Sequence, residues 1–567
     1  MKTKSRIYLP LIAIWLLLLA IAASAGNHKH HPLQQQIDSL VELNVPAGQP
    51  GGAVAVIHRG EVIHQQAYGM QDLEKGIANE ASTMFDLASV AKQFTGFAIL
   101  LLEQDGLIDL DENIRHYLPE MPGYAHTISV RHLLQHTSGL ASTDLLRLFA
   151  DKAFDEEWSQ EDEFNIIKNY PQLNFPPNTQ HTYSNAGYSL LAQVVESVAG
   201  MPFTAFMQQR IFRPLGMESS MVYTGPPMDI PRLAKGYGGS DEGFKHISSI
   251  SDYSYGAGNI FSNLSDMTRW GQHLLDPKAG DAALVQRMFN KYNTLENGDS
   301  ISYTYGFQVR NYRGVKLVEH SGGLPGFRSR VQVFPEEELV VIVLLNNQTI
   351  NSFNLSMALA RLFLEDRLQE PEPPQPREAI ALKPEKATRF EGTYLLEDGM
   401  EMIFFIENDT FWLELPGDTR FRLHPESETS FFLKEFDAGC HFVVEPEGDV
   451  NQMTWRQNGR DFPARRVSEA QALTTEQLRQ FAGVYFQSYL LTEYPIIFDE
   501  GKLEMQFPAT FSRYMGFETL QLNHIRDDRF DTGALGLMEF TRDADGQVNG
   551  FVINNVGRLS SIPFTRK

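Results

Sequence analysis

A proline-rich stretch divides this chain into two parts with different folding patterns. It reads Glu370-Pro371-Glu372-Pro373-Pro374-Gln375-Pro376. Proline at this density gives an extended, semi-rigid spacer, because each ring fixes φ and removes a backbone N–H donor. Helical and strand-like segments mix before this stretch, whereas strand-like alternation dominates after it. We therefore predict a linker over residues 369–383 that separates two kinds of domain.

Residues 26–368 are predicted to form one α+β domain. Segments with strand character are 53–57 and 61–68, joined at Arg59-Gly60, and later 315–319, 329–334 and 339–345. Helical segments lie between and after them, near 89–105, 130–135, 188–199 and 357–368. Strands at both ends with helices between favour a sheet that joins the two ends of the region.

The part after the linker contains an internal repeat. Phe390-Glu391-Gly392-Thr393-Tyr394 recurs as Phe481-Ala482-Gly483-Val484-Tyr485, and residues 410–416 and 447–453 resemble residues 502–508 and 545–551. Short strands between turn signals predict two small antiparallel β-barrels, over residues 384–470 and 471–567. Such barrels can hold a ligand in their mouths, but we favour a role in flanking, capping or dimerising the first domain.

The N-terminus is predicted to be a signal peptide over residues 1–25. Its basic residues are Lys2, Lys4 and Arg6, residues 7–23 are apolar, and Ala23-Ser24-Ala25 fits a small-x-small cleavage site. An uncleaved anchor is the alternative, although the apolar run is near the short end for a membrane span. We expect an exported protein, periplasmic or secreted, with no stable span once the signal is removed.

Composition excludes several functions. The net charge of −23 argues against a general nucleic-acid binder and against docking on anionic membranes. Cys440 is the only cysteine and is interpreted as structural. His28, His30 and His31 lack a carboxylate or cysteine that would complete a metal site. We expect no metal and no organic cofactor, and nothing in the sequence specifies an oligomeric state.

Ser89-Val90-Ala91-Lys92 has the spacing of an acyl-transfer site. A serine and a lysine three residues apart share one helix face. Burial lowers the pKa of a lysine, and a neutral amine can take the proton of a serine hydroxyl. The pair alone remains weak evidence for a nucleophile.

Two further segments carry polar groups suited to this chemistry. In Tyr183-Ser184-Asn185 a phenol could shuttle a proton, and an amide could hold a substrate amide. His320-Ser321-Gly322-Gly323 is expected between two strands, where glycines allow close approach of a substrate backbone. The N–H of Gly323 could join that of Ser89 as an oxyanion hole. His58-Arg59-Gly60 has the same His-x-Gly form but is assigned to a hairpin turn.

The order Ser-x-x-Lys, Tyr-x-Asn, His-x-Gly resembles the serine hydrolases of the class C β-lactamase and penicillin-binding-protein superfamily. Residues 132–140, 214–217 and 256–262 with Asp266 are also similar to that superfamily, so the resemblance covers about 32–368. It implies an antiparallel sheet flanked by helices. The layout of one such domain followed by two barrels resembles D-aminopeptidases of the superfamily.

The resemblance implies a role for each motif residue. Ser89 would become acylated, Lys92 and Tyr183 would share the proton transfers, and Asn185 would hold the substrate amide. His320 would replace the lysine of the Lys-Thr-Gly motif of true β-lactamases. A neutral histidine should weaken recognition of a substrate carboxylate, which favours peptidase or esterase relatives.

These arguments predict an exported serine hydrolase that forms an acyl-enzyme on a small amide, peptide or ester, with D-amino acids among the candidates. A class C-like β-lactamase or a carboxylesterase is the enzymatic alternative. A protein that binds penicillin or peptidoglycan fragments without turnover is the alternative of another class. The presence of Ser89, Lys92, Tyr183 and Asn185 together argues against that last alternative.

Overall fold

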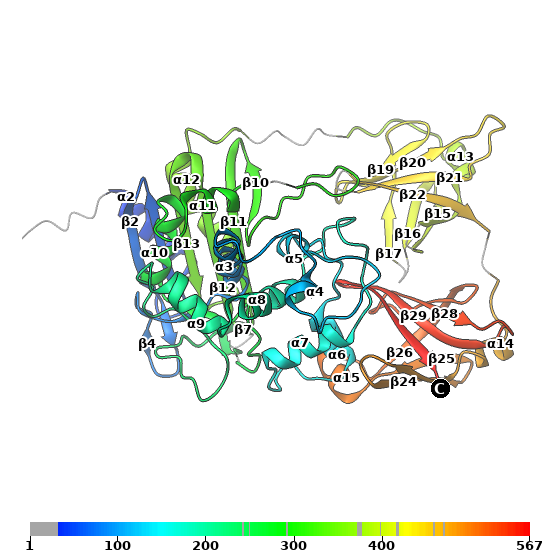
Figure 1. Cartoon of the computed structure of the whole chain (residues 1–567). Coiled ribbons are helices and arrows are strands. Elements are labelled where there is room, and N and C mark those ends of the chain that lie inside the picture. The colour runs from blue at the N-terminus through cyan, green and yellow to red at the C-terminus, as the bar shows by residue number, and fades with distance from the viewer. Residues whose placement is uncertain are drawn as a thin grey trace, which may run out of the picture.

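The computed structural model describes residues 32–567, except 241–242, 249, 291–292, 371–376, 397–398, 416–418, 458–459 and 469–470 (Figure 1). The expected signal peptide, the nearby histidines and the prolines of the linker lie outside the described residues. The described chain forms a first domain of helices and sheet and, on one side of it, two β-barrels.

A six-stranded antiparallel sheet forms the centre of the first domain. Its order is β10 (Gln308–Tyr312), β11 (Val315–Leu324), β12 (Phe327–Phe334), β13 (Leu339–Leu345), β1 (Gly52–His58) and β2 (Glu61–Tyr68). β1 pairs with β13 along its whole length, with Gly52 opposite Leu345. The two ends of the domain therefore meet in the middle of the sheet, as the sequence predicted.

Helices cover both faces of this sheet. One face packs against α2 (Pro32–Asn44) and α12 (Ser352–Leu364), and the other against α10 (Leu264–Leu275) (Figure 1). The sheet therefore separates two apolar cores, the first beneath α2 and α12 and the second beneath α10. Alternate residues of β1 point to opposite faces, so Val54 lies in the first core and Ala55 in the second. Both faces are buried, which is why β1 and β13 are continuous apolar runs.

The second core also contains the helices that surround the predicted motifs. These are η1 (Ala88–Ala91), α3 (Lys92–Gln104), α4 (Ile114–Tyr117), α5 (Val130–Leu134), α6 (Thr143–Phe149), α7 (Gln160–Asn169), α8 (Asn185–Ala199), α9 (Phe203–Met207), η2 (Gln208–Phe212) and α11 (Ala282–Met288). Short strands complete the domain: β3 (Met70–Asp72), β4 (Ile77–Ala78), β5 (Phe85–Asp86), β6 (Met221–Val222), β7 (Tyr237–Ser240), β8 (Gly243–His246) and β9 (Ile260–Ser262).

In the described part of the chain, no single helix is both long and apolar enough to cross a membrane. The pair formed by Asn185–Ala199 and Phe203–Phe212 meets that test by length and composition only, across a bend of 81°. Most of α8 is buried among the other helices of the first domain.

Three element boundaries differ from the sequence prediction. α12 begins at Ser352 rather than 357, because the Asn351 side chain accepts the N–H groups of the first turn. Ser89 lies in a 3₁₀ turn, and the α-helix begins only at Lys92. The His320–Gly323 segment is not a loop between strands but part of β11, because it pairs with β12 through Leu324.

The first barrel is a nine-stranded antiparallel sheet. In order its strands are β17 (Thr419–Arg422), β16 (Thr410–Leu415), β15 (Glu401–Glu407), β14 (Gly392–Leu396), β22 (Arg460–Val467), β21 (Gln452–Gln457), β20 (Ala438–Val443), β19 (Ser430–Phe432) and β18 (His424–Pro425). Its two edge strands are separated in sequence only by Leu423, so the sheet curls until its edges nearly meet. α13 (Pro384–Ala387) and η4 (Thr388–Phe390) precede it.

The second barrel is a closed ring of eight strands. They are β23 (Gly483–Gln487), β24 (Thr492–Asp499), β25 (Lys502–Gln506), β26 (Thr519–Arg526), β27 (Arg529–Asp531), β28 (Leu537–Arg542), β29 (Val548–Val556) and β30 (Leu559–Arg566). α14 (Thr475–Arg479) precedes the ring, and α15 (Ala509–Met515) interrupts it. The predicted fold class, an α+β domain followed by two antiparallel barrels, is confirmed.

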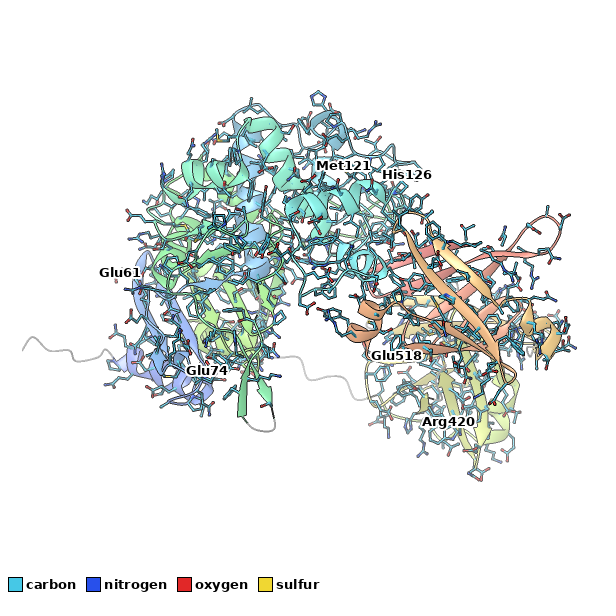
Figure 2. The ribbon with its side chains drawn as sticks, turned by 90° about the horizontal axis from the view of Figure 1, so that it is seen from below. Glu61, Glu74, Met121, His126, Arg420 and Glu518 are labelled. Carbon is cyan, nitrogen blue, oxygen red and sulfur yellow. The ribbon has the colours of Figure 1, made fainter. Side chains whose placement is uncertain are left out.

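The second barrel packs directly against the first domain. Phe149, the last residue of α6, lies 5.1 Å from Phe511 of α15 between ring centres, and its carbonyl accepts hydrogen bonds from Thr492 and Tyr494 at 2.7 and 2.6 Å. The two units share one apolar core. Figure 2 shows Glu518 and Arg420 of the two barrels on the side of the molecule away from Glu61 of β2.

Candidate active site

The Ser-x-x-Lys segment forms a tight turn that brings its two polar groups together. In a 3₁₀ turn, residues three apart lie almost directly above one another, and Lys92 Nζ is 3.2 Å from Ser89 Oγ. Ala88, just before the serine, has a φ of 47°, a left-handed conformation that is uncommon for alanine. Its N–H donates to Asp86 Oδ1 at 2.8 Å, which holds the turn at the end of β5.

Lys92 is completely buried, and its hydrogen bonds are compatible with a neutral amine. Nζ lies 2.9 Å from Asn185 Oδ1 and 2.8 Å from the carbonyl oxygen of Ala257, two atoms that can only accept. A neutral amine has two protons for these partners, and its lone pair then remains for the hydroxyl proton of Ser89. The geometry therefore suits a base directed at Ser89.

Electrostatics support the same protonation state. Burial lowers the pKa of Lys92 to about 7, with the negative charge of Asp144 opposing the shift and the positive charge of Arg558 adding to it. A lysine with this pKa is substantially neutral at neutral pH. It can serve as a general base without a further partner.

Tyr183 lies just before α8, beside both members of the pair. Lys92 Nζ is 4.9 Å from the centre of its ring. Its hydroxyl is buried and makes no hydrogen bond to a described residue. Burial raises the pKa of the phenol, and the nearby Ser89 hydroxyl partly offsets this. A protonated phenol beside Ser89 suits a proton donor better than a base.

Asn185, the first residue of α8, is oriented by hydrogen-bonding groups on both sides. Its Oδ1 accepts from Lys92, and its Nδ2 is 3.4 Å from Asp144 Oδ2. A carboxylate can only accept, so the amide orientation follows from its neighbours. The side chain also lines the cavity at Ser89, where a substrate carbonyl would meet the Nδ2 donor.

His320 lies on β11 and is held as a neutral imidazole. Nδ1 lies 2.7 Å from the Ser321 carbonyl oxygen, and Nε2 lies 2.7 Å from the Tyr303 hydroxyl. The carbonyl can only accept, so Nδ1 carries the proton and Nε2 accepts from Tyr303. Burial lowers the pKa of His320 to about 3, with Lys92 adding to the shift. The imidazole is therefore uncharged, and it does not line the cavity at Ser89.

The two glycines after His320 have different surroundings. A Cβ on Gly322 would lie 2.2 Å from the Leu87 carbonyl oxygen and 2.2 Å from Ser329 Oγ. The sequence suggested that a substrate backbone approaches these glycines closely. At Gly322 the close neighbour is instead the chain segment before Ser89. Gly323 lines the same cavity as Ser89, and Ser321 is exposed. An oxyanion hole from the N–H groups of Gly323 and Ser89 stays a prediction.

We expect Gly322→Ala to destabilise the protein by about 1–3 kcal/mol, because the added methyl group would overlap backbone that fixes the turn of Ser89. Gly323→Ala is the matched control. Its Cβ would meet only the flexible Arg328 side chain, at 3.5 Å, so we expect a change within about 0.5 kcal/mol. Thermal denaturation of both variants measures this. Equal stability of the two would contradict the close packing at Gly322.

Ser89 opens into a cavity of about 420 Å³. Its wall is rich in carboxylates, which are Asp86, Asp144, Asp155, Glu163 and Asp252. Of these, Asp252 pairs with Arg147 at 3.3 Å, and Asp155 pairs with Arg513 at 2.6 Å. Tyr514 of α15 also lines the cavity, so the second barrel contributes to its wall.

Crowding of these carboxylates changes their acidity. Burial raises the pKa of Asp86 and of Glu163 to about 7, and repulsion from Asp252 adds to both shifts. The pKa of Asp252 is itself raised, mainly by burial. A cation bound in the cavity would favour the ionised forms and relieve this repulsion.

Comparison with known proteins agrees with this geometry. The statistical model of the Beta-lactamase family matches residues 36–365, more than half of the chain. The chain belongs to the beta-lactamase family. Its serine hydrolase members include penicillin-binding-protein-like enzymes, and the superfamily suspected from the sequence motifs is confirmed.

Individual relatives of this beta-lactamase family chain cover between 59% and 76% of its length. Penicillin-binding protein 4* of Bacillus subtilis (strain 168) is 28% identical over 435 residues, which are 74% of this chain and 94% of that protein. The octameric penicillin-binding protein homologue from Pyrococcus abyssi is 21% identical with a TM-score of 0.53, over 76% of this chain and 99% of that one. D-amino acid amidase from Ochrobactrum anthropi SV3, solved with D-phenylalanine, is 23% identical with a TM-score of 0.51, over 59% and 99%. At these identities, the two structures establish a shared fold.

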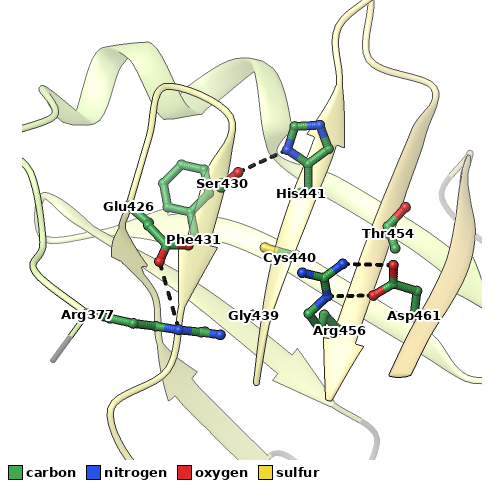
Figure 3. Close-up of a pocket in the computed structure, with 10 residues that line it drawn as sticks. All are labelled: Arg377, Glu426, Ser430, Phe431, Gly439, Cys440, His441, Thr454, Arg456 and Asp461. Carbon is green, nitrogen blue, oxygen red and sulfur yellow. Dashed lines mark hydrogen bonds and ion pairs between the residues drawn. The ribbon is translucent and has the colours of Figure 1, made fainter. Parts of the chain in front are cut away.

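A second hollow, of about 300 Å³, lies on the first barrel (Figure 3). Its charged groups satisfy one another, since Arg456 pairs with Asp461 at 2.6 Å and Arg377 with Glu426 at 3.8 Å. Burial raises the pKa of Cys440 on its wall, so the thiol stays protonated and unreactive. The hollow of this beta-lactamase family chain thus offers neither a free charge nor an activated nucleophile, and the chemistry centres on Ser89.

Sequence reasoning missed several groups of the site in this beta-lactamase family chain. Tyr303, which donates to His320, and Asp144, which contacts Asn185, belong to no motif that we recognised. The Ala257 carbonyl lies in a stretch noted only for its resemblance to the superfamily. Arg558 comes from the far end of the chain, where no pattern indicated a role. No group of three or more potential metal ligands occurs among the residues that the structure describes.

Proposed function

We propose that this protein is an exported serine hydrolase that cleaves small amides or peptides bearing a free ammonium group, with D-amino acid residues as the leading candidates. The supporting observation is the buried Lys92 amine, 3.2 Å from Ser89 Oγ and with a pKa of about 7. Such a pair activates a serine without a metal or an organic cofactor.

The reaction follows from the groups around Ser89. Lys92 takes the hydroxyl proton as Ser89 Oγ bonds to the substrate carbonyl carbon. The amide C–N bond then breaks, and the leaving nitrogen receives a proton through Tyr183. A water molecule attacks the resulting ester, again with a proton passing to Lys92, and releases the acid and free Ser89. No oxidant or further reactant is required.

The acidic wall of the cavity supports an ammonium-bearing substrate. Asp86 and Glu163 have raised pKa values there, and among the described residues Arg147 forms an ion pair with Asp252 alone. An ammonium group would gain from these carboxylates, whereas the carboxylate of a penicillin would be repelled by them. The same wall disfavours a class C-like β-lactamase.

A panel of four chromogenic substrates tests this proposal. D-Alanine p-nitroanilide should be cleaved with a kcat/KM at least about tenfold above that of its N-acetyl derivative, since acetylation removes one charge. L-Alanine p-nitroanilide tests stereochemistry, and nitrocefin tests β-lactamase activity. Faster cleavage of the N-acetyl derivative or of nitrocefin would contradict an ammonium-binding cavity.

Two alternatives have separate readouts. An esterase would hydrolyse p-nitrophenyl acetate far faster than any of the anilides. A binding protein without turnover would be acylated at Ser89 by labelled penicillin and would keep the label without releasing product. Export, proposed from residues 1–25, is tested by locating the full-length chain after cell fractionation.

A further inference from the structure

The geometry points to Arg558 of the second barrel as a binding site for a carboxylate on the leaving part of the substrate. This inference rests on the proposed function and adds a second charge to its substrate. The substrate would be a short peptide whose ammonium group lies at the acidic wall and whose terminal carboxylate meets Arg558. The second barrel would then supply the positive charge that the neutral His320 does not provide.

Arg558 is a cation without a partner beside the catalytic residues. Its guanidinium carbon lies 5.0 Å from the centre of the Tyr183 ring. The side chain is exposed, and its guanidinium makes no hydrogen bond or ion pair with any residue that the structure describes. Arg147, by contrast, pairs with Asp252 and is buried. Arg558 therefore keeps its donors available for a ligand.

The turn that carries Arg558 is fixed on the first domain. Gly557 and Arg558 form the two-residue loop between β29 and β30, and Gly557 has a φ of 56°, as the first position of a type II′ turn requires. Asn174 donates to the Arg558 carbonyl and accepts from the Ser560 N–H, both at 2.9 Å. The guanidinium is thus presented from an ordered backbone, which reduces the entropy lost on binding.

The position of Arg558 matches the departure side of the reaction. Tyr183 is the group that would protonate the leaving nitrogen, so the leaving residue would pass beside its ring, outside the lining of the acidic cavity. Arg558 also lowers the pKa of Lys92 and of Tyr183, so its charge is felt at the reacting groups. His320 is neutral and occupied by Tyr303, so β11 offers no competing cation at that residue.

A matched pair of substrates tests the assignment. D-Alanyl-D-alanine and D-alanyl-D-alaninamide differ only in the terminal carboxylate, and cleavage of the central bond is measured by chromatography of the released second residue. In Arg558→Gln we expect kcat/KM for the acid to fall about tenfold, chiefly through KM, while that for the amide stays within about twofold. Arg558→Lys should restore part of the loss.

Arg479→Gln is the control, because Arg479 also lies over an aromatic ring of this barrel, Phe498, but on α14 at its far side (Figure 1). It should leave both substrates unchanged. Equal losses on acid and amide in Arg558→Gln would show that the residue only positions Tyr183, and would overturn the assignment while leaving the proposed function intact.

If the wild type cleaves neither dipeptide, the p-nitroanilide panel decides the proposed function separately, and protection of Ser89 from a fluorophosphonate probe decides the assignment. D-Alanine should then protect better than D-alaninamide in the wild type and lose that advantage in Arg558→Gln. No difference between the two ligands in the wild type would reject a carboxylate site.

Discussion

Replacing Ser89 by alanine should abolish hydrolysis and covalent labelling. Removal of a nucleophile that works with its base as a unit lowers kcat by about 10³-fold or more. The variant should fold normally, because alanine fits the 3₁₀ turn and Lys92 keeps its bonds to Asn185 and Ala257. Labelling with a fluorophosphonate probe, followed by mass spectrometry, measures the loss.

Ser39→Ala is the control for this experiment. Ser39 lies exposed on α2, where its hydroxyl donates to a carbonyl one turn earlier. It should label at the wild-type rate. Undiminished labelling of Ser89→Ala would mean that another residue is the nucleophile.

Replacing Lys92 by methionine should lower kcat/KM by about 10²- to 10⁴-fold, the usual contribution of a general base. Methionine has a similar length and suits a buried position, whereas Lys92→Arg would introduce a guanidinium that cannot lose its proton at neutral pH. Steady-state assays of both variants on the best substrate of the panel measure the effect. Activity within tenfold of the wild type would exclude Lys92 as the base.

Comparison of the pH profiles of the wild type and Lys92→Met tests the same group, because Asp86 and Glu163 also have a pKa of about 7. The pKa of Lys92 is lowered to about 7, and its neutral form is the active one, so wild-type kcat/KM should rise as pH increases through about 7. His320, with a pKa of about 3, is already neutral there and adds no limb. Persistence of the limb in Lys92→Met would assign it to a different group.

The sequence predicted those parts of the site that lie close together in the chain. Ser89 and Lys92 are three residues apart, so any helical turn brings them together, and Tyr183 and Asn185 flank the start of one helix. The sheet followed from apolar runs at both ends of the first domain. Local spacing and periodicity therefore carried most of the correct inference.

The rest of the site depends on contacts between distant segments. Asp144 of α6 contacts Asn185 at the start of α8 across 41 residues of sequence, and Arg558 reaches Tyr183 only because the second barrel docks on Phe149. The identity of Gly322 was correctly singled out, but its close neighbour is Leu87 rather than a substrate. A single sequence contains no signal for such contacts, so the cavity's charge could not be foreseen.

The pairing of β1 with β13 sets the order in which the first domain can assemble. Gly52 must pair with Leu345, and closing the long stretch of chain between them costs entropy before any apolar contact compensates for it. Proteins dominated by such distant contacts fold slowly. During synthesis β1 must wait, unpaired on that edge, until β13 has left the ribosome, so the hydrophobic core completes late. Substitutions that strengthen only the local β1–β2 hairpin should therefore do little to speed folding.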